Sequence, residues 1–352
     1  MNFENLLQLV GDSYQAQTPV VVYSEPYART VCCLVAEKQA VAPGQLSNRK
    51  GFVFSPFQQD HPSYFIAESN RNVFRTDLPE PGSDRQVPEI GRQSDHQRYI
   101  DLIDRTVETI KHSEIKKIVI SRRAAYSLKG FSVDKLARSL FLSDIRAFKY
   151  LWFHPETGLW CGASPETLFK IDNGGFSTMA LAATKTLAES NRPWTDKEMK
   201  EQQFVSNYIR NVLEPFSRSL QVGELHDRKA GNLLHLCTLI EGLLKDGITI
   251  DDVLQKLHPT PAVCGTPMRA ALEYILVNEG YNREFYTGYL GPIDHDELSA
   301  SLYVNLRCAQ ITENEAGIFV GGGITVQSQA ESEWQETCNK QVVMLKVLSE
   351  FL

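Results

Sequence analysis

Two pairs of glutamates could supply oxygen ligands to a divalent cation. Glu198 and Glu201 lie in the sequence TDKEMKEQ, and Glu333 and Glu336 lie in SEWQET, so each pair has the spacing i, i+3. This spacing places both carboxylates of a pair on one face of a helix. One or two carboxylates, completed by water and by acid groups of a substrate, are typical of Mg²⁺ sites. Acids that complement the dipole at a helix start would show the same pattern.

A lysine and a glutamate have sequence surroundings that suit acid–base chemistry. Lys117 opens the apolar run KIVISR, where burial would favour the neutral amine that a general base requires. Glu166 follows Pro165 in GASPE, a turn in which a carboxyl group with few neighbours could act as a general acid. The structural alternatives are a lysine that extends to solvent from the strand entrance and a solvated turn glutamate.

Three further features could hold an anion. Arg307 lies in SLYVNLRCAQI, an expected strand in which it alternates with apolar residues. Its guanidinium could bind a carboxylate or form an internal salt bridge. Gly321 and Gly323 follow an apolar run, so their backbone is expected to come close to a ligand or to another strand. Lys340 shares one helix face with the second glutamate pair.

The remaining polar candidates have simpler explanations. Lys185 in LAATKT is predicted to be a loop lysine. His235 and His258 have no second metal-type ligand near them in the sequence, so we expect both to form hydrogen bonds in the core. The seven cysteines are scattered without CxxC spacing, which predicts reduced thiols rather than disulfides or a zinc site.

The elements that must position these residues are mostly β-strands. A short amphipathic helix is expected over residues 2–15, followed by β-type runs broken by Pro, Gly and Asn. These runs are PVVVYSEP, TVCCLVAE, GFVFSPF and YFIAES. Residues 77–93 are rich in proline and show almost no periodicity, which predicts a surface connection.

The rest of the chain alternates short strands with helices. Ser94 with Gln97, and Thr195 with Glu198, resemble capping boxes and predict that helices begin there. The expected strands are closely spaced, which indicates hairpins rather than βαβ units. They cover 117–122, 148–154, 158–162, 162–171 and 176–186. Further helices are expected at 95–112, 250–257, 266–278 and from about residue 332.

Composition limits the classes of function. With 352 residues and 42% hydrophobic content, the chain can bury a large core. A formal net charge of −7 without a basic cluster argues against a nucleic-acid partner. The sequence MNFENLLQLVGDSY lacks a signal-peptide pattern, and no later segment has the length of a membrane span. We therefore expect a cytoplasmic protein with no membrane partner, and we expect it to be a monomer.

The order of these motifs resembles the chorismate-utilising enzymes, and within them the isochorismate synthases most of all. The shared motifs are KIVISR, GASPE, an LAxT turn, a KExxE helix start, HPTPAVCGTP, LRCAQI, GGGI and EWQETCNK. Together they cover residues 95–352. Each motif is weak alone, but their order and spacing are specific.

The resemblance implies a role for each candidate residue. Lys117 would be the general base, and Glu166 would be the general acid. Residues matching substrate-binding positions are Ala183, Thr184, Ala262, Arg307, Gly321, Gly323 and Lys340. The magnesium glutamates of the family fall on Glu201 and Glu336, with Glu198 and Glu333 as nearby or water-mediated partners.

Three positions distinguish this chain within the family pattern. Ala262 stands where the amine-transferring relatives usually carry threonine, which favours water as the nucleophile. Ala183 replaces the usual glycine of the LAGT turn, which puts the close backbone approach there in doubt. Gln202 stands where a histidine is frequent.

The resemblance also implies the fold and the reaction. We expect an α+β fold, with residues 1–352 forming one large layered domain that has antiparallel central sheets and outer helices. Within it, 1–93 would be a variable part and 94–352 the catalytic core. The expected activity is Mg²⁺-dependent conversion of chorismate to isochorismate, for menaquinone or siderophore synthesis. The alternative is a salicylate synthase, which adds pyruvate elimination.

Overall fold

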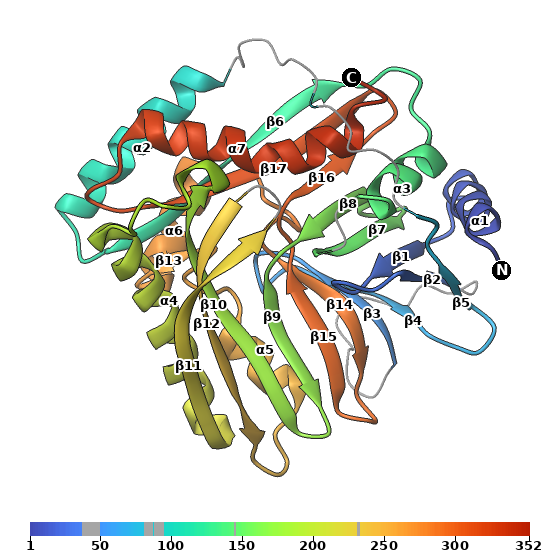
Figure 1. The fold of residues 1–352 in the computed structure, drawn as a ribbon, viewed down its shortest axis with the longest axis horizontal. Helices are drawn as coiled ribbons and strands as arrows, with labels where there is room; N and C mark the ends of the chain where they lie inside the picture. The colour runs from blue at the N-terminus through green and yellow to red at the C-terminus, as the bar shows by residue number, and fades with distance from the viewer. Residues whose placement is uncertain (37–49, 81–86, 88–94, 144–145, 231–232) are drawn as a thin grey trace.

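The computed structural model describes residues 1–36, 50–80, 87, 95–143, 146–230 and 233–352. Two antiparallel sheets face each other, and helices cover their outer surfaces (Figure 1). The predicted α+β layered fold is therefore confirmed. The hairpin-like spacing of the strands also gave the right topology, because every strand pair in both sheets is antiparallel.

The first sheet has nine strands and carries the predicted base lysine at the start of one of them. In spatial order they are β13 (Gly265–Thr266), β6 (Lys117–Ser127), β17 (Glu315–Ile324), β16 (Cys308–Ile311), β8 (Gly158–Ser164), β7 (Phe148–His154), β1 (Val20–Ser24), β2 (Thr30–Val35) and β5 (Val73–Asp77). Strands from the first 80 residues therefore belong to the same sheet as the strand that carries Lys117.

The second sheet has eight strands. In spatial order they are β11 (Ser217–Ala230), β12 (Leu233–Leu244), β10 (Gly175–Thr186), β9 (Thr167–Asp172), β15 (Ser299–Val304), β14 (Tyr289–Asp294), β3 (Lys50–Ser55) and β4 (Tyr64–Ala67). The long β11–β12 hairpin was not predicted. Most of the β11 side chains are exposed, so the alternation that marks a strand with one buried face is weak there.

Aromatic side chains fill the space between the two sheets. The rings of Phe148 and Tyr303 stack with their centroids 4.0 Å apart, and those of Phe54 and Phe285 stack at 4.3 Å. Trp152 and Trp160 are fully buried in the same cluster. Large rings supply much apolar area per residue, which allows two extended sheets to share one interior.

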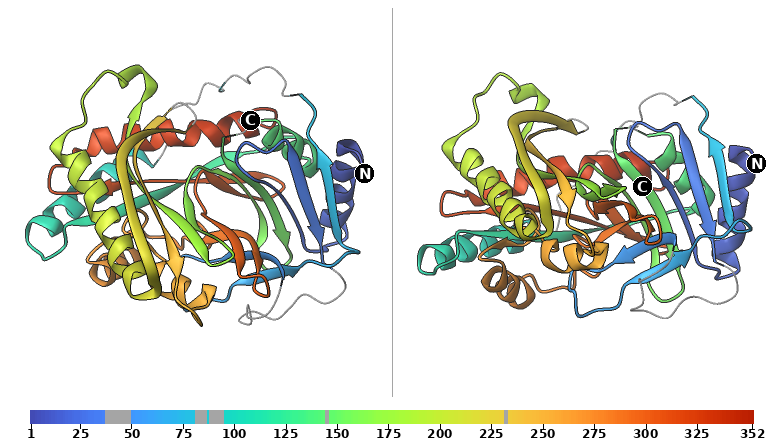
Figure 2. Two further views of the ribbon diagram at one scale, coloured as in Figure 1. Left: turned by 60° about the horizontal axis from the view of Figure 1, so that its bottom comes forward. Right: turned by 90° about the horizontal axis from the view of Figure 1, so that it is seen from below.

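Seven α-helices pack on the outside of the sheets in the described ranges. They are α1 (Phe3–Gln15), α2 (His96–Lys111), α3 (Val133–Phe141), α4 (Asp196–Leu213), α5 (Ile250–Leu257), α6 (Met268–Asn278) and α7 (Ala330–Leu348). Figure 1 shows α7 and α2 side by side across the first sheet, with α1 and α3 further along it. Figure 2 shows α4 running along the second sheet, where it contacts β10, β11 and β12.

Helix starts agree with the capping signals only in part. Thr195 and Glu198 form the predicted capping box at the start of α4. At α2 the N-cap is Asp95, whose side chain makes no capping hydrogen bond, and Gln97 donates to Asp101 instead. Ser94 lies outside the described residues, as does most of the predicted connection over 77–93. The short helix α3 was not predicted.

The segment SLYVNLRCAQI does not form the single continuous strand that was predicted. It divides into β15 and β16, which belong to opposite sheets. Arg307 lies at the crossing with φ +49°, so the prediction that it alternates within one strand is wrong. The change of sheet requires a sharp bend, and a left-handed residue provides it.

None of the helices in the described ranges is both long and apolar enough to cross a membrane.

Candidate active site

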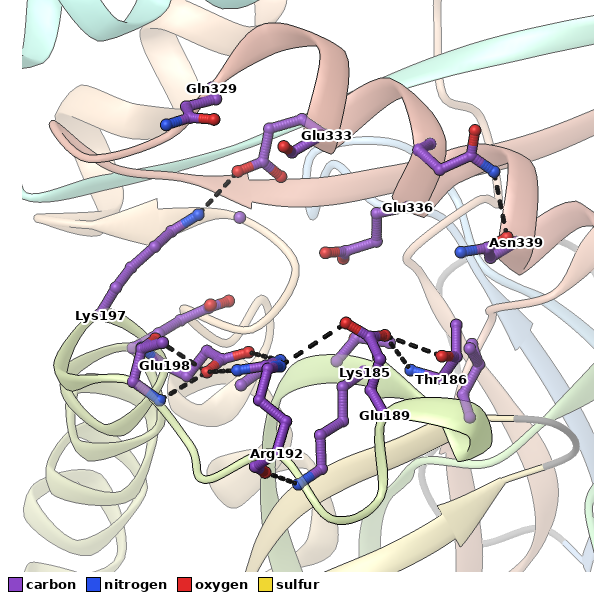
Figure 3. A pocket seen from close by; sticks show the side chains of 18 of the residues that line it. Lys185, Thr186, Glu189, Arg192, Lys197, Glu198, Gln329, Glu333, Glu336 and Asn339 are labelled. Atoms are coloured by element: carbon purple, nitrogen blue, oxygen red, sulfur yellow. Dashed lines mark hydrogen bonds and ion pairs between the residues drawn. The ribbon is translucent and has the colours of Figure 1, made fainter.

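A cavity of about 460 Å³ lies between α4 and α7 (Figure 3). The end of β10, the start of α4, the end of β17 and the first turns of α7 line it. Its volume falls in the range of sites for small organic ligands. Seven of the predicted site residues are among those that line it: Ala183, Thr184, Glu198, Glu201, Gly323, Glu333 and Glu336.

Lys117 is buried beside this cavity. Its side chain is 1% exposed, and its Nζ lies 3.0 Å from Oε1 of Glu201. The alternative that Lys117 extends to solvent from the strand entrance is therefore wrong. The contact links the start of β6 to α4.

The glycines of β17 make room for this ion pair. Gly321 and Gly323 lie opposite Ser121 and Val119 of β6, so the predicted close approach is to a strand. A Cβ atom at Gly323 would lie 2.4 Å from Oε1 of Glu201 and 2.6 Å from Cε of Lys117. Any side chain at Gly323 would displace the pair.

Glu166 occupies the β8–β9 turn and is buried, with 5% of its surface exposed. Burial raises the pKa of Glu166 to about 7, although the positive charges of Lys117, Arg307 and Lys340 oppose the shift. Its carboxyl group has no hydrogen-bond or ion-pair partner among the residues that the structure describes. A carboxyl group with this pKa can carry a proton near neutral pH and donate it, as a general acid must.

Arg307 and Lys340 supply positive charge to the same region. The Arg307 guanidinium forms no ion pair within the described ranges, so the internal salt bridge is not formed. Burial lowers its pKa, and the charges of Glu336 and Glu166 act against this shift. Lys340 donates to the carbonyl oxygen of Gly321 at 2.8 Å and pairs with Glu336 one helical turn away. An unpaired guanidinium beside a lysine suits an anionic ligand.

The four predicted metal glutamates all face the cavity, but their partners differ. Arg192 binds Glu198 through two hydrogen bonds of 2.8 and 3.0 Å. Burial opposes ionisation of Glu198, but the bonds from Arg192 and Thr195 outweigh it and lower its pKa. Arg192 thus holds both carboxylate oxygens of Glu198, whereas Glu201, Glu333 and Glu336 each form an ion pair with a single lysine.

Glu333 and Glu336 approach one point from two turns of α7. A Cβ atom at Gly322 would lie 3.1 Å from Oε2 of Glu333 and 3.5 Å from Oε1 of Glu336, so only glycine leaves the space between them open. Burial raises the pKa of Glu333, and the neighbouring charge of Glu336 adds to the shift. A cation between them would relieve this repulsion.

This donor set fits Mg²⁺. No group of three or more His, Cys, Asp or Glu side chains in the described part of the chain is arranged to hold a metal ion by itself. Mg²⁺ commonly needs only one or two carboxylates, because water and substrate oxygens complete its six ligands. Glu333 and Glu336 provide that number, with Glu201 near by.

Ala183 adopts a conformation that favours glycine. Its φ is +59°, at a bulge where the pairing of β10 with β12 skips Ala183 and Thr184. This explains why glycine is usual in the family motif. The left-handed region is unfavourable for alanine because its Cβ crowds the backbone. The side chain is small enough for Ala183 still to line the cavity.

His235 is a buried hydrogen-bonding residue, as predicted, but one of its ring nitrogens has a feature that the sequence did not indicate. Its Nδ1 lies 2.9 Å from the Ala183 carbonyl oxygen, to which it must donate, while its buried Nε2 has no partner among the described residues. Burial, reinforced by the charges of Arg307 and Lys340, lowers the pKa of His235 to about 3. The neutral ring therefore presents Nε2 as a hydrogen-bond acceptor. The strand pairing across the bulge sets this orientation, and the sequence holds no signal for it.

The other minor predictions have mixed outcomes. Lys185 is not a loop lysine: it is buried in β10 and donates to the carbonyl oxygens of Ser190 and Arg192. His258 is buried and contacts the carbonyl oxygen of Phe57, as expected for a core histidine. All seven cysteines are unpaired thiols, as predicted.

Ala262 and Gln202 do not line the cavity. Ala262 packs against the apolar cluster that includes Val205 and Val263. Gln202 is buried and donates to Thr238 Oγ1 at 2.8 Å, which links α4 to β12.

Replacement of Ala183 by glycine is expected to stabilise the fold. The strain of a left-handed alanine, roughly 1–2 kcal/mol, exceeds the roughly 0.4–1 kcal/mol by which glycine favours the unfolded chain. Chemical denaturation should show a gain of about 0.5–1 kcal/mol in the free energy of unfolding. Ala182→Gly, in regular strand pairing, is the control and should lose stability.

The buried Glu166 should make stability depend on pH. Its pKa is raised on folding, so its contribution is full below about pH 4.5 and is lost as the pH rises through about 7. Relative to Glu166→Gln, the wild-type free energy of unfolding should fall by about 3 kcal/mol between pH 4 and pH 8. If the difference in the free energy of unfolding between wild type and Glu166→Gln were the same at pH 4 and pH 8, the raised pKa of Glu166 would be contradicted.

Comparison with known proteins places this geometry in a family. Residues 58–349 match the family model described as chorismate binding enzyme. The chain is 34% identical over 257 residues to the salicylate biosynthesis isochorismate synthase of Pseudomonas aeruginosa, which covers 69% of this chain and 53% of that protein. It is 30% identical over 270 residues to isochorismate synthase DhbC of Bacillus subtilis, with coverage of 71% and 67%.

Solved structures agree in fold. A crystal structure of DhbC from Bacillus anthracis, described as a 2,3-dihydroxybenzoate-specific isochorismate synthase, superposes with a TM-score of 0.82 and 25% identity. The superposition covers 97% of this chain and 99% of that one. The match to the Pseudomonas protein spans about half of that relative, whereas this structural match spans nearly all of both chains. This chain is thus an enzyme of the chorismate-binding family.

Proposed function

We propose that the protein is an isochorismate synthase, which converts chorismate to isochorismate with the help of Mg²⁺. The observation that carries the proposal is the buried Glu166. Burial raises its pKa to about 7, and the positive charges of Lys117, Arg307 and Lys340 lie close enough to oppose this shift. One acid and three cations thus share one site in a chain of this family. Chorismate is a dianion, and this charge pattern complements it.

Arg307 and Lys340 would bind the carboxylates of the substrate. The guanidinium of Arg307 can take a carboxylate through two hydrogen bonds, and Lys340 adds a point charge. Lys340 is fixed by the Gly321 carbonyl at 2.8 Å, so its ammonium group is already oriented before ligand binding. Substrate binding would therefore need little rearrangement of these two groups.

Lys117 and Glu166 would move the protons. Neutral Lys117 would accept a proton at Nζ from the water that attacks C2 of the ring. As the C2–O bond forms and the double bonds shift, the C4–O bond breaks, and Glu166 would protonate the departing hydroxyl group. Nζ of Lys117 lies 3.0 Å from Oε1 of Glu201, so Lys117 would have to leave this ion pair in order to act as a base.

Glu333 and Glu336 would hold Mg²⁺, with Glu201 near by and Glu198 outside the direct ligands because Arg192 binds both of its carboxylate oxygens. When bound, the ion would neutralise substrate carboxylate charge in a protein whose formal net charge is −7.

The relatives carry names that refer to salicylate, 2,3-dihydroxybenzoate and menaquinone. We propose that isochorismate from this enzyme likewise serves menaquinone or siderophore synthesis in the cytoplasm. Salicylate synthase, which would add pyruvate elimination, is the alternative that product analysis separates.

The products formed from chorismate test the proposed reaction. The purified protein with Mg²⁺ should yield isochorismate, resolved by chromatography, and EDTA should abolish the conversion because the substrate charge is no longer neutralised. Accumulation of salicylate and pyruvate would assign the alternative activity. Unchanged chorismate in the presence of Mg²⁺ would overturn both.

Replacement of Lys117 by alanine should lower turnover by at least about a hundredfold, because general-base catalysis is lost. Chorismate binding, measured by calorimetry, should remain within a few fold of wild type. Lys116 is the matched control, since it is the exposed neighbour on the same strand entrance. Lys116→Ala should retain normal turnover; a Lys117→Ala variant that also did so would exclude Lys117 as the base.

A further inference from the structure

Lys197 links the two helices that border the cavity. It lies in the first turn of α4, and its Nζ reaches Oε1 of Glu333 on α7 at 2.7 Å (Figure 3). Glu333 is only 4% exposed, whereas Lys197 is 25% exposed, so the lysine approaches the buried carboxylate from the open side. This ion pair spans the cavity between elements distant in the sequence.

The position of Lys197 requires an explanation beyond the helix itself. The N-terminus of a helix carries partial positive charge, which disfavours a lysine in the first turn. Asp196 and Glu198 on either side of it are the favourable residue types there. The compensating interaction for Lys197 is Glu333, which lies on another helix.

Glu333 is also one of the two carboxylates that meet at Gly322. Its Oε2 and Oε1 of Glu336 lie 3.1 and 3.5 Å from where a Cβ atom of Gly322 would be, and Lys197 holds the other oxygen of Glu333. A divalent cation bound to this pair would bring a second positive charge close to the ammonium group. Two cations that share one carboxylate in a nearly buried site repel each other strongly.

We propose that Lys197 is an internal counter-cation for Glu333, one member of the Glu333–Glu336 pair, and that a divalent cation must displace it in order to bind. Lys340 pairs with the other member, Glu336. This inference rests on the metal site of the proposed function and adds a residue that acts against it. In the absence of metal, Lys197 neutralises Glu333 and joins α4 to α7. Metal binding releases this connection, so metal affinity is set partly by competition with Lys197.

Direct metal titration tests the competition without any measurement of activity. Mn²⁺ accepts the same oxygen ligands as Mg²⁺ and can be followed by electron paramagnetic resonance on the substrate-free protein. Lys197→Met, which keeps the length of the side chain but removes the charge, should bind Mn²⁺ about tenfold more tightly than wild type. Lys197→Arg, which can maintain the ion pair, should remain close to wild type.

Lys200→Met is the matched charge control. Lys200 is an exposed lysine on the same helix and is not among the residues that line the cavity. Its removal changes the net charge by the same amount, but at a screened position it should alter Mn²⁺ affinity by less than about twofold. Equal tightening in the Lys197→Met and Lys200→Met variants would show only long-range electrostatics and would overturn the proposal, as would unchanged or weaker binding in Lys197→Met.

Glu336→Gln separates this inference from the metal site itself. If wild type binds Mn²⁺ and Glu336→Gln does not, the proposed metal site is supported. The Lys197 variants then test only whether Lys197 competes with the metal ion. If neither wild type nor Lys197→Met binds Mn²⁺, the metal site is wrong and the counter-cation role falls with it. Thermal unfolding of each variant shows whether the α4–α7 connection has been lost without loss of the fold.

Discussion

The close pairing of β6 with β17 is the constraint on which the site depends. Gly321, Gly322 and Gly323 lie opposite Ser121, Ile120 and Val119, and a side chain at any of the three would meet backbone or charged atoms within 3.1 Å. The absence of side chains there lets α7 bring its glutamates over the sheet while Lys117 and Glu201 meet beneath. Three glycines thus allow buried charges from three separate elements to approach each other.

Once these charges are buried together, each must be neutralised by another. In the absence of ligand the cavity achieves this with lysines and an arginine: Lys117 on Glu201, Lys197 on Glu333, Lys340 on Glu336 and Arg192 on Glu198. Glu166 has no such partner in the part of the chain that the structure describes, and burial keeps it closer to its neutral form by raising its pKa. Buried ion pairs contribute little net stability, so their concentration here is better explained by chemistry than by folding.

The two-sheet architecture supplies the rigidity that such a site requires. Stacked aromatic rings between the sheets fix their separation, and the crossing at Arg307 joins one sheet to the other next to Glu166. Glu166, Lys117 and Arg307, the proposed acid, base and anion-binding residue, therefore lie on strands or strand ends rather than on long loops. Sites built on regular elements hold their geometry more closely than sites on loops.

The sequence by itself determined the fold class, most helix and strand positions and the family. It also predicted which residues carry chemistry, because Lys117, Glu166 and the glutamate pairs belong to motifs whose order is specific. These features are local or depend only on order along the chain. Hydrophobic periodicity and capping signals act over a few residues, so α4 and α5 could be predicted from them.

Only the tertiary structure decided which side chains contact each other in the site. The ion pair between Lys117 and Glu201 joins residues 84 positions apart, and the contact of Lys197 with Glu333 joins residues 136 positions apart. The orientation of His235, whose Nε2 has no partner among the described residues, depends on strand register. The division of one apparent strand at Arg307 and the burial of Lys185 have the same origin. Side-chain partners, burial and a left-handed bend depend on the packing of distant elements, and no local pattern encodes them.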